Sequence, residues 1–226
     1  WVDPINQFNF YDSLLYSVGI VSNKFRDVCT WQQTQGMLNI YRGALGNATV
    51  HWDYLTNNDQ VWDTYMGGMN EFNFRQYGPG DESFADFLQK NKGSLGVPPE
   101  VNYIPGNDKV YDSFHEDISK SYSADLVVAI RNVKVLIYNG QEDYVVNTAG
   151  VLNYLNSLRW DNIASWKRAR KDVWRINNAI RGWAKVSGNL WFVLVNRAGH
   201  LVPTDQPDSA FNMLGHFIRE DRNWSQ

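Results

Sequence analysis

The sequence is poor in cysteine and has no long apolar run. Cys29 is the only cysteine among 226 residues, so the chain cannot close an internal disulfide. We expect it to be a buried free thiol, the alternative being a bond to another segment. No stretch approaches the roughly 20 apolar residues that a membrane span needs, and we therefore predict no span.

Basic clusters and metal-ligand spacings are missing as well. The net charge is −3, and the 21 basic residues form no block, which excludes the charge pattern of a nucleic-acid-binding surface. The four histidines are scattered along the chain, so we predict no metal and no cofactor. His216, in the expected last helix, is interpreted as a surface or capping residue.

The chain opens with "WVDPINQ", without a starting methionine, signal peptide or transit pattern. This opening is typical of the middle of a domain, so we expect a chain cleaved from, or given as part of, a longer protein. Asn47-Ala48-Thr49 and Asn223-Trp224-Ser225 are glycosylation sequons. They predict glycans on Asn47 and Asn223, and with them passage through secretory compartments.

The character of the sequence changes near residue 119. Residues 1–118 are rich in Asn, Gly, Asp and aromatic side chains, with turn signals such as "QYGPGDES" and "LGVPPEVNYIPGND". Between these signals the apolar spacing predicts helices over 10–20, 29–41, 54–69 and 83–88. Residues 119–226 alternate instead between strand-like and helix-like patterns, which favours an α/β fold.

Within this second part, "VKVLIYNG" (133–140) predicts a strand buried on both faces, as in a parallel sheet. A helix follows over 148–160, and two extended runs flank a hairpin turn at 187–189. "DQP" at 205–207 predicts the start of a last helix, with Asp205 as its N-cap. Its expected apolar face comprises Ala210, Phe211, Leu214, Phe217 and Ile218.

Polar residues follow two of these strands. Gly140 allows a sharp turn before Glu142 and Asp143, and Gly199 leaves room for a close approach before His200. Since loops at the carboxyl ends of neighbouring parallel strands adjoin, an acid and an imidazole can meet there. A carboxylate on one ring nitrogen leaves the other free to take a proton from a nucleophile. The alternative is a surface carboxylate and a capping histidine.

A nucleophile to match this pair is missing. The acid-then-histidine order is that of an α/β-hydrolase triad, whose serine lies upstream in a Gly-x-Ser-x-Gly turn between strand and helix. "KGSLG" (92–96) lacks the first glycine in register, and no apolar strand precedes it. "YSVG" around Ser17 fails too.

Three stretches resemble the serine carboxypeptidase family (peptidase family S10), and in particular its vitellogenic-like branch. They are "KVLIYNGQEDYVVN", "AGHLVPTDQPDSAFNMLGHFI" and the opening "WVDPINQ". The resemblance is dense over residues 100–220 and looser over 20–100. It implies the C-terminal half of an α/β-hydrolase fold, with a mainly helical cap inserted within residues 1–118 and the last strands and helices in 119–226.

The resemblance also implies roles for single residues. Asp143 matches the triad acid, His200 matches the triad base, and Leu201 falls where the family has an apolar residue facing the leaving-group pocket. Tyr144 and Val146 fall near the substrate side of the acid loop. The family's "GESYAG" nucleophile motif is not in this chain.

Our leading hypothesis is thus a chain or fragment of a serine-type exopeptidase of an acidic or secretory compartment, lysosomal, vacuolar or secreted. We expect it to act on peptides, and to be inactive without an N-terminal chain or segment that carries the serine. An acyltransferase on the same scaffold is an alternative. Another is a structural or binding remnant in a larger assembly, and homodimerisation is left open.

Overall fold

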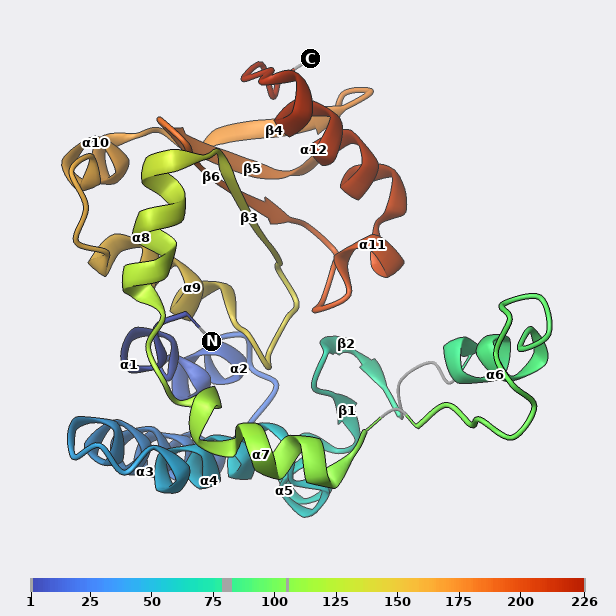
Figure 1. Ribbon diagram of the computed structural model, residues 1–226. Helices are drawn as coiled ribbons and strands as arrows, with labels where there is room; N and C mark the ends of the chain where they lie inside the picture. Colours follow the sequence, from blue (N-terminus) through green and yellow to red (C-terminus); the bar gives the residue numbers. More distant parts are fainter. Residues whose placement is uncertain (1, 79–82, 105, 226) are drawn as a thin grey trace.

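The computed structural model describes residues 2–78, 83–104 and 106–225. A four-stranded sheet forms the centre of the C-terminal part, in the order β3-β6-β5-β4 (Figure 1). The strands are β3 (Val135–Gly140), β4 (Asp172–Ile176), β5 (Ala179–Ser187) and β6 (Leu190–Val195). β3 and β6 are parallel, and the other neighbours are antiparallel, which confirms the predicted parallel pair and the hairpin at 187–189.

Helices cover both faces of this sheet. α8 (Ser123–Asn132), α9 (Thr148–Ser157) and α10 (Ile163–Arg168) lie on one face, and α11 (Val202–Asp205) and α12 (Pro207–Arg219) lie on the other (Figure 1). β6 is buried along its whole length and alternates between the two cores. Leu190, Phe192 and Leu194 pack toward α8 and α9, whereas Trp191, Val193 and Val195 pack toward α12.

The prediction that β3 is buried on both faces was wrong. Its first four residues are half-buried or exposed, and Tyr138 is 44% exposed. Among the described residues β3 pairs with β6 alone, so it is an edge strand. An apolar run therefore indicated a strand, but it did not reveal how much of that strand this chain covers.

The closing helix also differs from the prediction. α12 begins at Pro207 with Gln206 as its N-cap, and Asp205 instead ends α11. Of the predicted apolar face, Ala210 and Phe217 do pack against the core. Three of its members are largely exposed: Phe211 (82%), Leu214 (48%) and Ile218 (67%).

His216, predicted to be a surface or capping residue, is buried. Its ring stacks on Trp224 with centroids 4.4 Å apart, and its Nδ1 lies 3.1 Å from the carbonyl oxygen of Asp221. The helix thus uses a histidine where the pattern suggested only apolar side chains would face inward.

The N-terminal part is mainly helical. α1 (Pro4–Gln7) packs against α9, and beyond it lie α2 (Tyr11–Ser17), α3 (Asn23–Tyr41) and α4 (Leu45–Thr56). α5 (Asp59–Met66), α6 (Ser83–Lys90) and α7 (Asp108–Ile118) complete its helices. The single helix predicted over 54–69 was wrong, because Asn58 caps α5 and separates it from α4. Part of the loop "QYGPGDES" lies outside the described residues.

A short hairpin, β1 (Met69–Asn70) and β2 (Asn73–Tyr77), joins this helical part to the sheet. It lies between the cap helices and the loops that follow β3 and β6 (Figure 1). The sequence prediction placed no strand here. We refer to residues 69–77 as the cap hairpin.

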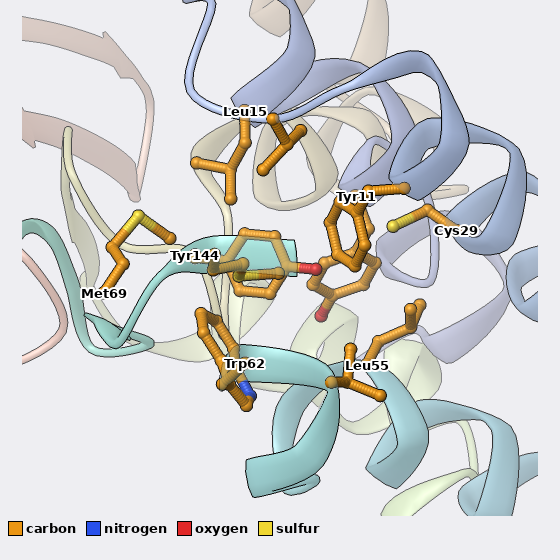
Figure 2. Packing of buried hydrophobic residues seen from close by; sticks show 11 residues of the cluster. Tyr11, Leu15, Cys29, Leu55, Trp62, Met69 and Tyr144 are labelled. Carbon is orange, nitrogen blue, oxygen red and sulfur yellow. The ribbon is translucent and has the colours of Figure 1, made fainter. Parts of the chain in front are cut away.

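The core of the cap is aromatic and also contains the single cysteine. Tyr11, Phe25, Cys29, Trp62 and Tyr144 are all buried in it (Figure 2). Cys29 is fully buried and unbonded to another cysteine, and burial raises the pKa of its thiol to about 12. The thiol therefore packs as a small apolar group. Tyr144 belongs to the loop that follows β3 and carries Asp143, which we call the acid loop. The cap core therefore also anchors this loop.

Candidate active site

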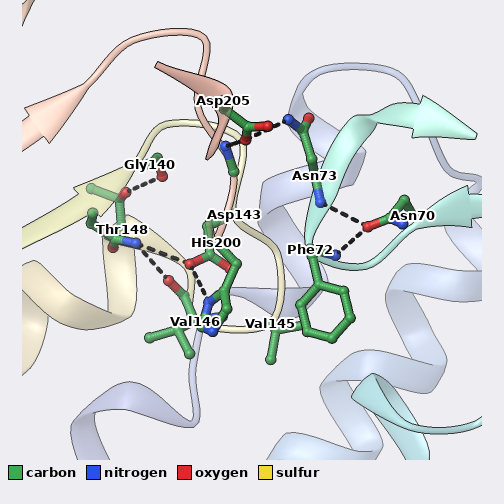
Figure 3. Close-up of polar contacts among 12 residues, drawn as sticks. Asn70, Phe72, Asn73, Gly140, Asp143, Val145, Val146, Thr148, His200 and Asp205 are labelled. Atoms are coloured by element: carbon green, nitrogen blue, oxygen red, sulfur yellow. Dashed lines mark hydrogen bonds and ion pairs between the residues drawn. The ribbon is translucent and has the colours of Figure 1, made fainter. Parts of the chain in front are cut away.

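The candidate site lies at the carboxyl ends of β3 and β6. These strands are parallel neighbours with Gly140 opposite Val195, so the loops that leave them adjoin. His200 Nδ1 lies 3.0 Å from Asp143 Oδ2 (Figure 3). The acid and the imidazole therefore meet as the order of the strands predicted.

Asp143 is held in place from several directions. It is 2% exposed, and the backbone N–H of Val146 donates to its Oδ1 at 2.9 Å. The side-chain amide of Asn139 donates to Oδ2 at 3.1 Å. Burial raises the pKa of Asp143, while the hydrogen bonds from His200, Val146 and Asn139 act in the opposite direction. These bonds hold the carboxylate in place, with Oδ2 directed at the imidazole of His200.

His200 presents one nitrogen to Asp143 and leaves the other open. An ionised carboxylate can only accept, so Nδ1 carries the proton of this bond. The bond raises the pKa of His200, although desolvation partly offsets the rise. No side chain among the described residues bonds to Nε2. The ring is 37% exposed and borders a cavity of about 330 Å³ that Asn139, Val146 and Tyr154 also line.

Two glycines let the backbones meet here. A Cβ on Gly140 would lie 2.0 Å from the carbonyl oxygen of Gly199, so this glycine is required by close approach rather than by a sharp turn. A Cβ on Gly199 would lie 2.1 Å from the carbonyl oxygen of Phe72. The room predicted beside Gly199 is therefore filled by the cap hairpin.

The cap hairpin bonds through its backbone to both of the loops that carry Asp143 and His200. The N–H of His200 donates to the carbonyl oxygen of Phe72 at 2.7 Å. On the acid loop, the Glu142 carbonyl accepts from the N–H of Phe74 at 3.1 Å, and the N–H of Val145 donates to Glu71 at 3.3 Å. One short hairpin thus spans the two loops that carry the acid and the base.

Side chains reinforce this junction. Asp205 Oδ2 accepts from the backbone N–H of Gly199 at 2.7 Å and from Asn73 Nδ2 at 3.0 Å (Figure 3). Arg75 Nη1 lies 2.8 Å from Oε1 of Glu142, whose side chain is only 7% exposed. Glu142 is therefore paired away from His200, whereas its neighbour Asp143 faces the imidazole.

The three predicted substrate contacts occupy different surroundings. Leu201 is 58% exposed beside His200, and the partly buried Val146 lines the cavity. Tyr144 is fully buried, with its ring 5.0 Å from that of Trp62. A substrate would reach Tyr144 only if the cap core opened, so the structure brings Val146 and Leu201 to the site and keeps Tyr144 out of it.

Sequence reasoning missed the cap hairpin and Asn139. The alternating stretch "EFNFR" (71–75) was a signal for a strand, and the polar Asn139 inside an otherwise apolar run was a signal for a buried contact. The Oδ1 of Asn139 is buried and has no partner among the described residues.

The predicted glycosylation sites both lie on the surface. The side chains of Asn47, near the start of α4, and Asn223, beyond α12, are exposed. The Thr49 hydroxyl of the first sequon is buried against the carbonyl oxygen of His115 at 2.6 Å. In the described ranges, no three His, Cys, Asp or Glu side chains converge as a metal site would require. None of the helices described there combines the length and hydropathy of a membrane span.

Comparison with known proteins relates this site to one family. The sequence model described as serine carboxypeptidase matches residues 1–220. The venom serine carboxypeptidase of Apis mellifera is 29% identical over 224 residues, covering 95% of this chain and 48% of that protein. The vitellogenic carboxypeptidase of Aedes aegypti is 26% identical, with 98% of this chain and 49% of that protein covered.

A solved structure supports the fold. A prohormone-processing carboxypeptidase from Saccharomyces cerevisiae superposes with a TM-score of 0.77 at 19% identity. That alignment covers all of this chain and 55% of the yeast chain, so this chain spans about half the length of the proteins it matches. The sheet, its covering helices and the inserted cap are accordingly the C-terminal part of an α/β-hydrolase fold. The chain belongs to the serine carboxypeptidase family.

Proposed function

We propose that this chain supplies the acid and the base of a serine carboxypeptidase that releases C-terminal residues from peptides through an acyl-enzyme. The Asp143–His200 pair carries this proposal. Its 3.0 Å contact joins a carboxylate that is 2% exposed to a ring whose second nitrogen is open. A solvated ion pair at the surface would fix neither the tautomer nor the direction of the ring.

The proposed chemistry begins with the serine of the complementary segment. His200 Nε2 takes the proton from its Oγ as that oxygen forms a bond to the carbonyl carbon of the last peptide bond. Asp143 stabilises the imidazolium that results. His200 then protonates the leaving amine as the C–N bond breaks. Water repeats the cycle on the acyl-enzyme, which frees the shortened peptide and the serine.

The serine is proposed to come from an N-terminal chain or segment of the same precursor. Supporting this, the chain contains no Gly-x-Ser-x-Gly and matches about half of its relatives' length. In the described structure the outer edge of β3 is unpaired, and edge strands of this kind favour further pairing. The exposed Phe211, Leu214 and Ile218 on α12 offer an apolar surface to the same partner.

Leu201 and Val146 are proposed to contact the substrate on either side of the pair. Leu201 presents an exposed apolar side chain directly after the base, and Val146 lines the cavity beside the acid. We keep Tyr144 as a support of the acid loop, because it is buried in the cap core. Replacing Leu201 by Ala should raise KM for apolar C-terminal residues more than it changes kcat.

We also propose that the protein is glycosylated and is lysosomal, vacuolar or secreted, because the asparagines of both sequons are exposed. Asn47 and Asn223 are accessible on the folded surface. Treating the native protein with an N-glycosidase should lower its mass by one or two glycans. An unchanged mass would contradict this part of the proposal.

The test uses the native particle together with its serine-bearing segment. Its mass is measured first under reducing and non-reducing conditions, which separates a two-chain particle from a homodimer or a lone chain. A blocked dipeptide with a free carboxyl end should then lose its last residue, whereas the same dipeptide ending in an amide should survive. Acyl transfer from a glucose ester without peptide cleavage would favour the acyltransferase instead. Failure of both reactions in a serine-containing particle would contradict the proposal.

A further inference from the structure

The cap hairpin contacts both the loop that carries Asp143 and the loop that carries His200. In the described structure, the backbone N–H of His200 bonds to Phe72 of the cap and to no acceptor of its own sheet. We propose that Asn73 and Asp205 are positioning residues that hold His200 in register with Asp143, by tying the loop after β6 to the cap hairpin. This rests on the proposed function only in calling the pair a proton-transfer pair.

The tie consists of two hydrogen bonds, from Asn73 and from Gly199, that share one acceptor atom of Asp205. Asp205 Oδ2 receives the Gly199 N–H at 2.7 Å and Asn73 Nδ2 at 3.0 Å, so one oxygen joins the loop to the hairpin. Asn73 is 6% exposed, and bonds to a charged acceptor in such a place are stronger than bonds at the surface. The residue before His200 is thereby fixed from the side of the cap.

The cap hairpin is itself rigid. Asn70 Oδ1 accepts the backbone N–H groups of Phe72 at 2.8 Å and Asn73 at 3.2 Å, which closes the turn. Asn73 Oδ1 accepts the N–H of Arg75 at 3.1 Å. At its base, Met69 is buried in the cap core (Figure 2). The hairpin can therefore transmit the position of the cap to the loop.

Close packing accompanies the tie. Gly199 lies so near the hairpin that a Cβ would be 2.6 Å from the Cβ of Asn73. The ring of Phe72 also lies beside that of His200, with centroids 5.6 Å apart. The N–H of His200 bonds to Phe72 and not to Asp205, so loss of the tie should loosen that bond and let the ring turn away from Asp143 Oδ2, without removing the acceptor itself.

The test is nuclear magnetic resonance of the native particle with this chain isotopically labelled. It needs no catalytic activity and so separates this proposal from the proposed function. The readouts are the downfield Nδ1–H resonance of His200 and its pKa, with His51 in the cap as internal reference. N73D keeps the acceptor for Arg75 but places a carboxylate against Asp205. We expect it to lose the Nδ1–H resonance. The pKa of His200 is read in N73A, which adds no charge, and should fall there toward 6.5.

D205N is the matched conservative variant. An amide oxygen at the Oδ2 position still accepts from both donors, so the His200 resonance and pKa should stay close to those of the wild type. D161N is the control for loss of a carboxylate, because Asp161 pairs with Arg131 on the surface, outside the acid–base pair and the cap hairpin. The His51 titration should be the same in every variant.

Thermal unfolding is recorded for each variant, so that loss of the fold is not mistaken for loss of position. If N73D does not fold, N73A removes the donor without adding a charge and should still weaken the His200 resonance. A folded N73D or N73A with a wild-type resonance and pKa for His200 overturns the proposal. Loss of the resonance in D205N equal to that in N73D would overturn it too, since charge rather than position would then be decisive.

Discussion

Asp143 and His200 meet at the carboxyl end of the sheet, whereas Asp53 and His115 meet between α4 and α7 of the cap. The first contact is 3.0 Å and its carboxylate is 2% exposed. The second is 3.5 Å, with side chains 24% and 27% exposed, and Asp53 also accepts from Tyr111 and Asn57. Residue type is the same in both pairs and each carboxylate meets three donors among the described residues, so the difference lies in burial and in the length of the contact to the histidine.

This comparison shows how the proposed proton-transfer pair differs from a second acid–histidine contact in the same chain. The buried carboxylate is directed by Val146 and Asn139, and the backbone N–H of His200 bonds to the cap hairpin. The cap pair has a partly exposed carboxylate and a contact of 3.5 Å, an arrangement typical of a contact that joins two helices. Catalytic assignment therefore depends on the surroundings of the pair.

The largest expected effect separates the two pairs by activity. In the particle that contains the serine, D143N should lower kcat by roughly 10⁴-fold, because the imidazole is no longer held in the productive tautomer. D53N should leave kcat within about twofold. Hydrolysis of a blocked dipeptide measures both, and similar losses in the two variants would remove the distinction.

A smaller effect is expected on stability when a glycine is replaced beside the site or in the cap. An alanine at Gly199 places a Cβ 2.1 Å from a backbone oxygen, which should destabilise the fold by about 3 kcal/mol, the upper end for overpacking. Gly46 in α4 is the matched control, since its nearest new contact would be 3.5 Å away. There alanine should be neutral or stabilise by up to about 1 kcal/mol. Urea unfolding of both variants provides the measurement, and equal stabilities would count against the close approach.

Removing the basic partner of an ion pair should cost more stability beside the site than on the surface of α6. R75A leaves the buried Glu142 carboxylate without its partner and should cost about 1–2 kcal/mol, since Arg75 itself is partly solvated. K90A removes a solvated pair with Asp86 within α6 and should cost at most about 0.5 kcal/mol. The midpoints of chemical unfolding compare the two losses of stability. A larger loss in K90A than in R75A would contradict this prediction.

The smallest expected effect is a difference in titration between two histidines. The bond to Asp143 raises the pKa of His200 above 6.5, and burial lowers that of His51 below it. The folded state thus holds the His200 proton more tightly than the unfolded chain does. That stabilisation is complete below pH 6.5 and is lost as the pH rises through the folded pKa. For His51 the sign is opposite, with a cost that appears as the pH falls below 6.5.

Resolved histidine signals over a pH series test this order. A His200 midpoint at or below that of His51 would contradict the bond as the dominant influence. In D143N the His200 midpoint should fall, whereas the His51 midpoint should not change.

The sequence predicted the parts of the fold in which local pattern and burial agree. The run 190–195 is apolar and lies in the interior of the sheet, and the predicted hairpin turn at 187–189 is present, with Gly188 in the left-handed region. Asp143 and His200 could be brought together from strand order alone. Their catalytic role stays a prediction.

The remainder required tertiary information. Asn73 and Asp205 are 132 positions apart, and no local pattern joins them. The sequence could not show that Phe211 is exposed or that His216 is buried, because α12 has apolar side chains around more than one face. Nor could an apolar run reveal β3 as an edge strand, since the residues that would cover it need not belong to the same segment of sequence.

Labelling by a fluorophosphonate probe is the most direct measurement of the central claim, that Asp143 and His200 activate a serine on a complementary segment. The native particle should become labelled on that segment, and H200A and D143N should label far more slowly while D53N labels at the wild-type rate. A wild-type particle that contains the segment but takes no label, or equal labelling in H200A, would contradict the claim.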